Sequence, residues 1–394
     1  MQKKLIALAV AGLVSGGAFA QSNVTLYGRV DAGLASYSGT SVGLNLGAPS
    51  WSGVQGGLNR TNLIGVKGEE DLGSGLKAIY NYEMNLNTDG GGDAQSAGTT
   101  GLDATGFRIA ALGLQGGFGA VEFGRNYTPF FQVVAAVDPF GTSNGPGSAT
   151  IIHALGGATV RYSSSVRYTS PNIGGFQAKV MYGFGEDASN SAKSPSDNMY
   201  SFSGIYANGP LVLAFAHINN KQMIIRNIVS GVSATGGAVS ASGVATAEIP
   251  YVFLDVKSTV VGGAYNLGVA NLTLAYNKLE GQNDSIDHGD WHFGVTAPMG
   301  AGQLQFAYNK ANDKNASNLD ANHWAVGYSY DLSKRTALYT QYGAVSNKNG
   351  AAYAVNGSGL SAIQAGAGLL TAADASGRAS FREKGLVFGA RHTF

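Results

Sequence analysis

The sequence contains no cysteine and few charged residues, which make up 12% of the 394-residue chain. Without cysteine there can be no disulfide bond, and thiol chemistry and thiolate metal sites are excluded. Beyond its first twenty residues the chain also lacks an apolar run of 18 residues, which excludes a helical membrane protein. Its 25 basic and 24 acidic residues nearly balance, so nothing indicates a nucleic-acid partner.

The first twenty residues have the pattern of a secretory signal peptide. Two lysines precede an apolar run from Leu5 to Val14, and Ala18 and Ala20 supply the small residues of a cleavage site. We therefore expect residues 1–20 to be a removed signal peptide. Residues 21–394 are expected to form one domain, because no linker, charge block or composition shift divides them.

Apolar and polar residues alternate along segments of roughly ten residues, the length of a tilted strand that crosses a membrane. In the first segment Leu26 and Val30 share one face, while Arg29 and Asp31 share the other. The 59 glycines, 19 tyrosines and 17 phenylalanines suit tight turns and aromatic girdles at the membrane surfaces. The same alternation recurs at residues 75–85, 302–310 and 386–394.

The connections between these segments alternate between short and long, and both kinds are rich in turn-forming residues. Short turns are predicted at residues 71–75, 115–119, 171–175, 208–210, 266–269, 298–302 and 331–334. Long loops are predicted at residues 36–58, 87–105, 128–158, 185–197, 220–250, 281–287, 311–320 and 347–383.

Seven short turns and eight long loops join sixteen strands. The expected fold is all-β, a closed 16-stranded antiparallel transmembrane β-barrel with short periplasmic turns and long extracellular loops. The sheet must close because backbone exposed to lipid has to be fully hydrogen-bonded. Closure at this strand number leaves an aqueous lumen and not a packed core. The expected location is the bacterial outer membrane.

Five stretches, in order, resemble the trimeric general porins of β-proteobacteria over nearly the whole mature length. They are residues 23–34, 65–83, 107–129, 160–176 and 381–394. The resemblance implies a passive diffusion channel for small hydrophilic solutes, and a homotrimer in which each subunit has its own pore. It also implies that the third long loop, residues 128–158, folds into the barrel and narrows it.

In such porins acidic residues of this loop face a row of arginines on the barrel wall. Alternation independently puts Arg29 and Lys77 on the polar face of their strands, and the apolar neighbours of Arg108 are consistent with an inward direction. Any one of these charges could also be ordinary lining of a wet lumen. By position, the candidates for the pore constriction are Arg29, Lys77, Glu83, Arg108, Arg125, Asp138 and Arg161.

One position departs from the family pattern. Leu63 stands where many relatives have an arginine, and Arg60 lies three positions earlier. Charged rings at a constriction set ion selectivity, and low-dielectric walls strengthen their field. With one basic residue fewer, we expect a channel that is weakly anion-preferring or non-selective.

The histidines give little indication of a metal or catalytic site, and no cofactor is expected. His288 and His292 would form a metal-binding pair on a helix, but on a strand they are two residues on one face beside the girdle residue Trp291. All six histidines are expected at the surface or the rim. No Ser–His spacing suggests a hydrolase, so an enzyme is the weakest interpretation.

The remaining expectations concern partners. The terminal Phe394 and its alternating apolar neighbours resemble the signal read by the barrel-assembly machinery, although they could simply close the barrel. Outer-membrane lipid and lipopolysaccharide would surround the protein. The main alternative function is a surface adhesin or receptor whose long loops make the contacts, in which case the third loop would fold outward.

Overall fold

We describe the protein from a computed structural model. The predicted signal peptide and His153 lie outside the described residues, as do large parts of the long loops. The structure describes residues 23–40, 50–86, 88, 107–147, 160–185, 198–225, 252–316, 318–349, 351, 353, 355 and 382–394.

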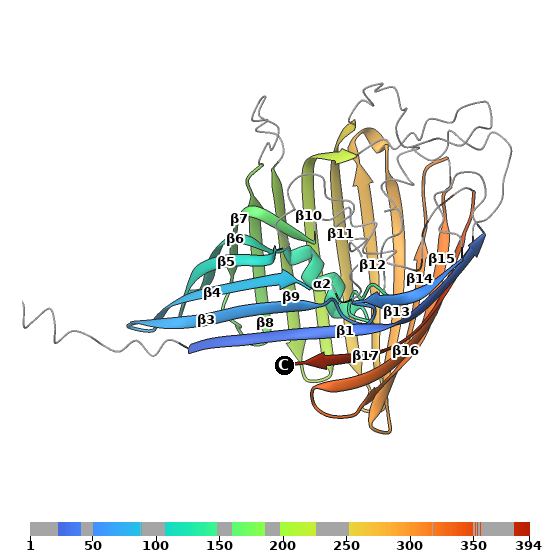
Figure 1. Cartoon of the computed structure of the whole chain (residues 1–394). Helices are drawn as coiled ribbons and strands as arrows, with labels where there is room; N and C mark the ends of the chain where they lie inside the picture. Colours follow the sequence, from blue (N-terminus) through green and yellow to red (C-terminus); the bar gives the residue numbers. More distant parts are fainter. Residues whose placement is uncertain are drawn as a thin grey trace, which may run out of the picture.

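Antiparallel strands form a single sheet that curves round on itself (Figure 1). The first strand, β1 (Asn23–Thr40), pairs with the last, β17 (Arg382–Thr393), so the sheet closes. The two halves of β1 pair separately with β2 (Trp51–Gly56) and β3 (Leu63–Gly73). These two segments are therefore one interrupted strand, and the barrel has the sixteen strands predicted from the sequence.

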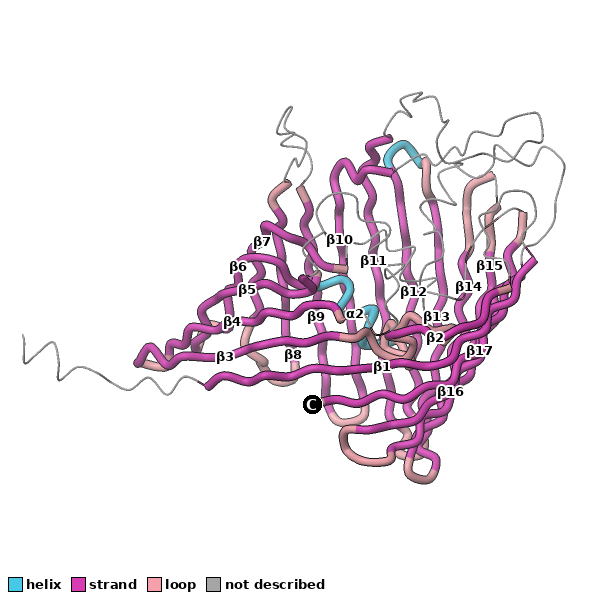
Figure 2. Tube along the Cα trace, in the orientation of Figure 1, coloured by secondary structure: helices cyan, strands magenta, loops and turns pink. Residues whose placement is uncertain are grey.

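The other strands follow in chain order, each paired with the next (Figure 2). They are β4 (Leu76–Asn85), β5 (Phe107–Gly116), β6 (Gly119–Tyr127), β7 (Arg161–Thr169), β8 (Phe176–Gly183), β9 (Met199–Asn208), β10 (Leu211–Ile225), β11 (Val252–Asn266), β12 (Asn271–Gly281), β13 (Asp287–Met299), β14 (Gly302–Ala311), β15 (Ala321–Asp331) and β16 (Thr336–Asn347). Between β6 and β7 lies the helix α2 (Pro129–Val137), and a single 3-10 turn, η1 (Gln282–Asp284), follows β12.

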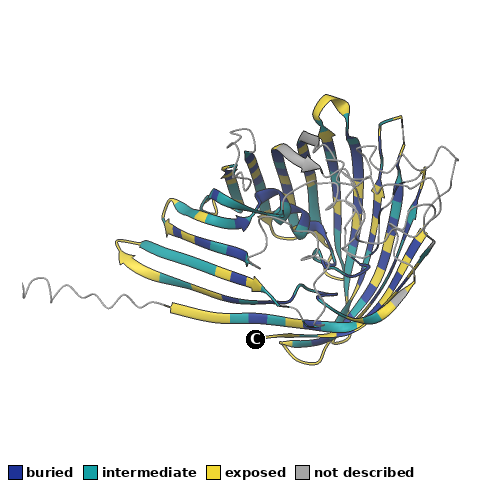
Figure 3. Cartoon of the chain, turned by 45° about the horizontal axis from the view of Figure 1, so that its top comes forward, coloured by how far each residue is buried: buried dark blue, intermediate teal, exposed yellow. Residues whose placement is uncertain are grey.

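Along each strand the side chains alternate between two environments (Figure 3). Many of the exposed ones are large apolar residues: Leu26, Leu274 and Phe388 are 62%, 53% and 55% exposed. Intervening residues such as Asp31 and Asn277 are fully buried on the other face. Because the apolar side chains are the exposed ones, the outer face is suited to lipid and the inner face is polar.

The predicted turns all lie between consecutive strands, but two predicted loops are shorter than expected. Strand β1 continues to Thr40 and β2 begins at Trp51, so the loop predicted at residues 36–58 is wrong at both ends. The serine- and glycine-rich composition of this stretch concealed the strand ends. Strand β10 continues to Ile225, so the loop predicted at residues 220–250 begins later than expected. The loop predicted at residues 281–287 agrees with the strand ends, because β12 ends at Gly281, β13 begins at Asp287 and η1 lies between them. No helix in the described part of the chain is long and apolar enough to span a bilayer.

Helix α2 lies inside the ring of strands (Figure 1) and packs against β8 to β12. Thr128 caps its first turn by accepting a hydrogen bond from the Phe131 N–H at 3.2 Å, and Pro129 opens the helix without an unused donor. Its apolar side buries Phe130 and Val134 against small wall residues such as Ala214. Burial of this side fixes the helix to the inner wall.

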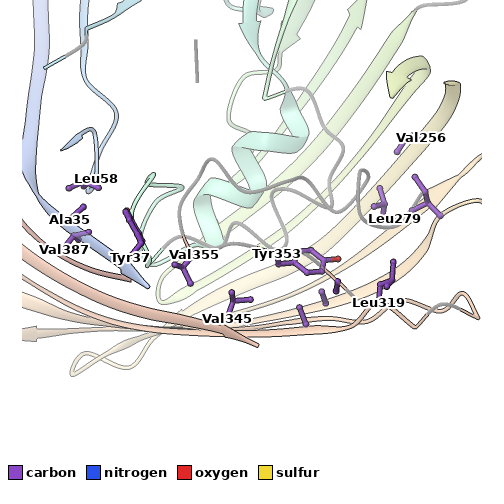
Figure 4. Packing of buried hydrophobic residues seen from close by; sticks show 14 of the residues in the cluster. Ala35, Tyr37, Leu58, Val256, Leu279, Leu319, Val345, Tyr353, Val355 and Val387 are labelled. Atoms are coloured by element: carbon purple, nitrogen blue, oxygen red, sulfur yellow. The ribbon is translucent and has the colours of Figure 1, made fainter. Parts of the chain in front are cut away.

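A second apolar cluster covers the inner wall further round the barrel (Figure 4). Tyr353 and Val355, from the connection between β16 and β17, are buried together with Val345 of β16 and Leu319. Part of the inner face is therefore covered by Tyr353 and Val355 and is shielded from water.

Candidate pore constriction

The segment after α2, residues 138–147, lies against the inner face of the barrel wall and is here called the inner loop. Asp138 shapes its start, because its carboxylate accepts hydrogen bonds from the N–H groups of Phe140 at 2.9 Å and Thr142 at 2.6 Å. Asp138 is only 6% exposed, so its charge is held among these donors.

Wall side chains hold the backbone of the inner loop at both ends. Gln305 of β14 donates to the Pro139 carbonyl oxygen at 2.5 Å. Arg60 donates to the Phe140 carbonyl oxygen at 2.6 Å. Near the other end, Gln341 of β16 accepts from the Gly147 N–H at 3.3 Å. Because these are backbone contacts, they fix the path of the loop independently of its side chains.

Arg60 comes from the interruption of the second strand, residues 57–62. Gly57 adopts a positive φ of 70°, a conformation that favours glycine, and turns the chain out of the strand. The N–H groups of Asn59 and Arg60 then donate to the carboxylate of Asp31 at 3.2 and 2.9 Å. The other oxygen of Asp31 accepts from the Tyr339 hydroxyl at 2.6 Å. A fully buried carboxylate thus organises the interruption from the inner side.

Two further arginines surround this interruption. Arg29 of β1 donates to the Thr61 carbonyl oxygen at 3.0 Å, and Arg391 of β17 donates to the Asn59 side chain at 2.6 Å. Arg29 is close enough to Arg60, Arg108 and Arg391 for their charges to act on it.

Arg108 reaches the inner face because β5 contains a bulge. Glu83 of β4 pairs with Ile109 and Met84 pairs with Phe107, so Arg108 is an extra residue between two consecutive pairs. On a regular strand Arg108 would share the outward direction of Leu112, which is 59% exposed. The extra residue shifts the alternation, and Arg108 is instead buried in the wall beside Glu83.

The Arg108 guanidinium has a full set of partners. It lies 3.4 Å from the Glu83 carboxylate, and it donates to the Asn85 side-chain oxygen at 3.0 Å and to the Tyr127 hydroxyl at 2.5 Å. Arg161 at the start of β7 lies over the same Tyr127 ring, 5.4 Å from its centre. Arg108 also lies over this ring, 6.0 Å from its centre, so the aromatic ring of Tyr127 attracts both cations.

Arg125 completes the row. It donates to the Phe107 carbonyl oxygen at 3.0 Å and to the Ser163 hydroxyl at 2.9 Å, and its charge acts on Arg161. We call these residues the arginine cluster: Arg29, Arg60, Arg108, Arg125, Arg161 and Arg391.

The chain is similar to known proteins of bacterial outer membranes. A family model described as "Gram-negative porin" matches residues 7–350. "Outer membrane porin protein 32" of Delftia acidovorans is 30% identical over the full length of both chains. An outer membrane porin protein of Bordetella pertussis is 30% identical over 87% of this chain and 94% of its own. The chain is a Gram-negative porin.

The fold of this porin agrees with a solved relative. The "Anion-selective porin from Comamonas acidovorans" superposes with a TM-score of 0.70 at 27% identity, and the match covers 95% of this chain and all of the other. The porin is thus an outer-membrane protein and a channel, and the family is not one of enzymes. The described residues contain no group of three metal-ligating side chains that could hold an ion.

The structure brings six of the seven predicted site residues towards one region of the porin. Arg29, Glu83, Arg108, Arg125 and Arg161 join through the contacts above, and Asp138 lies in the inner loop facing Arg60. Lys77 lies elsewhere. It is beside the turn that follows β3, its side chain is 40% exposed, and it forms an ion pair with Glu69 at 2.6 Å.

Sequence reasoning underestimated Arg60 and did not select Arg391 or Asp31. The inward direction of Arg391 and Asp31 follows from alternation, which could have identified them as candidates. The position of Arg60 depends on the interruption of the second strand. Gly56 and Gly57 mark that interruption, but glycine is frequent throughout this sequence.

The predicted placement of the histidines at the surface or rim is wrong for His288, His292 and His323. All three are buried on the inner face, at 1% exposure or less. The end of α2 and the inner loop cover His292 and His323, whose rings contact the Val137 and Pro146 carbonyl oxygens. Strand periodicity gives no sign of this covering. His392 is exposed as expected.

Proposed function

We propose that this porin is a general diffusion channel for small hydrophilic solutes and ions, with a weak anion preference or none. Its constriction would lie between the arginine cluster and the inner loop. The observation that carries the proposal is the hydrogen bond from Arg60 to the Phe140 carbonyl oxygen. That bond joins the cluster directly to the loop and puts a cation beside Asp138.

The charges in this region favour anions. The arginine cluster has six guanidinium groups, and the carboxylates beside them are Asp31, Glu83 and Asp138. Each of these carboxylates already accepts hydrogen bonds or pairs with an arginine. Arginine keeps its charge even when it is crowded by other arginines. The net positive field in a low-dielectric channel would raise the local concentration of anions.

The departure at Leu63 supports a weak preference over a strong one. Leu63 is 7% exposed and occupies the inner position directly across from Arg29. Arg60 supplies a cation near the same place, but its guanidinium is engaged by the inner loop. The solved relative is titled anion-selective, and we propose that any selectivity of this porin has the same sign and less strength.

Assembly is proposed on the same basis. A homotrimer with one pore per subunit, cleavage of residues 1–20, and recognition of the terminal Phe394 by the barrel-assembly machinery are expected for a porin of this kind.

Conductance in planar lipid bilayers tests the proposal. Purified porin should produce open steps, and the reversal potential in a KCl gradient should report a slight anion preference. The double substitution R108S/R161S should shift the reversal potential towards cation selectivity, because it removes two of the six guanidinium groups.

The control removes the same number of charges away from the lumen, in R335S/R382S, since Arg335 and Arg382 are both exposed. An absence of conductance from folded wild-type protein would refute the channel. An equal shift from the two double variants would refute the proposed constriction.

A further inference from the structure

Three side chains on neighbouring strands form a continuous hydrogen-bonded chain between two backbone carbonyl groups. His292 of β13, Asn309 of β14 and His323 of β15 are direct cross-strand partners. His292 Nε2 lies 3.0 Å from the Val137 carbonyl oxygen at the end of α2, and His323 Nε2 lies 2.9 Å from the Pro146 carbonyl oxygen. The three side chains thus hold both ends of the inner loop.

Asn309 joins the two rings. Its Oδ1 lies 2.6 Å from His292 Nδ1, and its Nδ2 lies 3.0 Å from His323 Nδ1. All three side chains are 1% exposed or less, so no ring nitrogen can exchange its partner for bulk water.

The hydrogen-bond donors and acceptors of these three side chains and the two carbonyl groups can be counted. A carbonyl oxygen only accepts, so Nε2 of each ring must carry hydrogen. A neutral imidazole has a single N–H, and in both rings this hydrogen is already used. The ring that faces the amide NH2 group can then accept at Nδ1 and remain neutral. The ring that faces the amide oxygen must also donate from Nδ1, and it is therefore a charged imidazolium.

The result does not depend on how the amide is turned. The side-chain amide of an asparagine has two orientations, related by a half turn, that exchange its oxygen and its nitrogen. Turning Asn309 would exchange the roles of His292 and His323, and one ring would still face an oxygen. In either arrangement the chain is satisfied only when one of the two histidines carries an extra proton.

We infer that His292, Asn309 and His323 are positioning residues that hold the inner loop and share one buried positive charge. In the orientation of Asn309 described above, His292 carries the charge. The effect of this buried charge on the pore rests on the proposed function. The requirement for one extra proton on the two histidines does not. The charge would add to the field of the arginine cluster from the opposite side of the inner loop.

The titratable and charged groups around these three side chains are compatible with one cation. Asp138 lies close enough to His323 for its negative charge to act on it. Asp290 precedes His292 by two residues on the same face of β13, and it is fully buried. On the other side of Asp138, Arg60 contributes a positive charge. Loss of the proton would leave a ring nitrogen facing the amide oxygen without hydrogen, which weakens the hold on the loop.

Substitution of Asn309 gives a graded test. In N309L neither ring faces an oxygen, so no imidazolium is required, and both bonds to the loop carbonyl groups can persist. In N309D both rings face a carboxylate oxygen, so two imidazolium groups are required. Nitrogen-15 NMR of histidine-labelled porin in detergent at about pH 7.5, where exposed histidines are mostly neutral, should show one persistent imidazolium in wild type, none in N309L and two in N309D.

The control H217Q removes a half-buried histidine that contacts Tyr200 and Phe202 and takes no part in this chain. It should leave the imidazolium count at one. A wild-type spectrum without an imidazolium, or the same count in wild type and N309D, would overturn the inference. Because the spectrum needs no conductance, this outcome is separate from a failure of the channel proposal.

A bilayer measurement tests the consequence for the pore. At about pH 7.5, where exposed histidines are mostly neutral, N309L should have a weaker anion preference than the wild type, because it lacks the buried charge. H217Q should have the reversal potential of the wild type. An N309L reversal potential equal to that of the wild type would show that the charge does not act on the pore.

Discussion

Arg60, in the interruption between β2 and β3, and Lys77, on β4, carry the same charge, but their partners differ. The guanidinium of Arg60 donates to the inner loop, whereas the ammonium of Lys77 pairs with Glu69 near a turn. An exposed ion pair of this kind contributes little and is screened by salt. An inward direction alone is therefore not enough for a basic residue to contribute to the proposed constriction. The residue must also lie at the level of the inner loop.

This difference predicts opposite outcomes for two matched substitutions. R60S should reduce the anion preference, because it removes a cation beside Asp138. It should also make the conductance noisier, since the charge-assisted hydrogen bond to the Phe140 carbonyl oxygen, worth about 1.5–3 kcal/mol, is lost. K77S should change neither property. Reversal potentials and single-channel recordings distinguish the two, and an effect of K77S as large as that of R60S would contradict the assignment.

Alternation predicted the inward direction of Arg29 from its immediate neighbours. It could not predict the contacts that hold the interruption of the second strand beside Arg29. Asp31 holds the interruption through Asn59 and through Tyr339, a residue that lies 308 positions away in the sequence. Contacts across such separations depend on the closed sheet and leave no local pattern. The site could thus be predicted as a set of inward charges, but not as a connected structure.

Among the elements, regular strands were the predictable part, because their two-residue period is visible in the sequence. The irregular elements were not. The bulge that turns Arg108 inward adds one residue to β5, and the interruption at residues 57–62 splits the second strand. Neither irregularity has a distinctive amino-acid composition in this sequence. Both alter which side chains reach the lumen. The proposed constriction therefore lies where the regularity of the strands fails.

Strand β8 allows the face assignment to be tested with neighbouring residues. Val180 is 52% exposed on the outer face, and Lys179 points inward, where it donates to the Gln132 side chain at 2.6 Å. V180K should destabilise the folded barrel by about 2–4 kcal/mol if it lies near the bilayer midplane. K179V should cost much less, because it removes one hydrogen bond in a polar lumen.

Urea titrations of folding into lipid vesicles measure both variants of β8. Equal losses of stability in V180K and K179V would contradict the assignment of the two faces.

At the scale of the whole molecule, closure of the sheet is the feature on which everything else depends. The last residue of the chain joins the first strand through two backbone hydrogen bonds, from the Gly28 N–H to the Phe394 carbonyl oxygen and from the Phe394 N–H to the Gly28 carbonyl oxygen, both at 3.0 Å. Asp31 and Arg391 face each other across the same seam. Closure therefore also brings together the arginines from the two ends of the sequence.

The seam also depends on side-chain size at Gly28. A Cβ atom there would lie 2.3 Å from the ring of Phe394, so the ring occupies the space that a larger residue would need. G28A should destabilise the barrel by about 1–3 kcal/mol, the usual cost of overpacking, and should lower the temperature at which its mobility in detergent gels becomes that of unfolded protein. G117A is the control, because a Cβ atom at that turn meets nothing within 4 Å.

A double-variant cycle separates the ring from general effects of alanine. If the clash with Phe394 causes the loss, G28A should cost less in an F394A background than in wild type, although the nearby Leu63 carbonyl oxygen, 2.9 Å from the added atom, would keep part of the penalty. Equal costs in the two backgrounds would show that the Phe394 ring does not pack over Gly28 in the membrane, and the seam would then be held by its backbone hydrogen bonds alone.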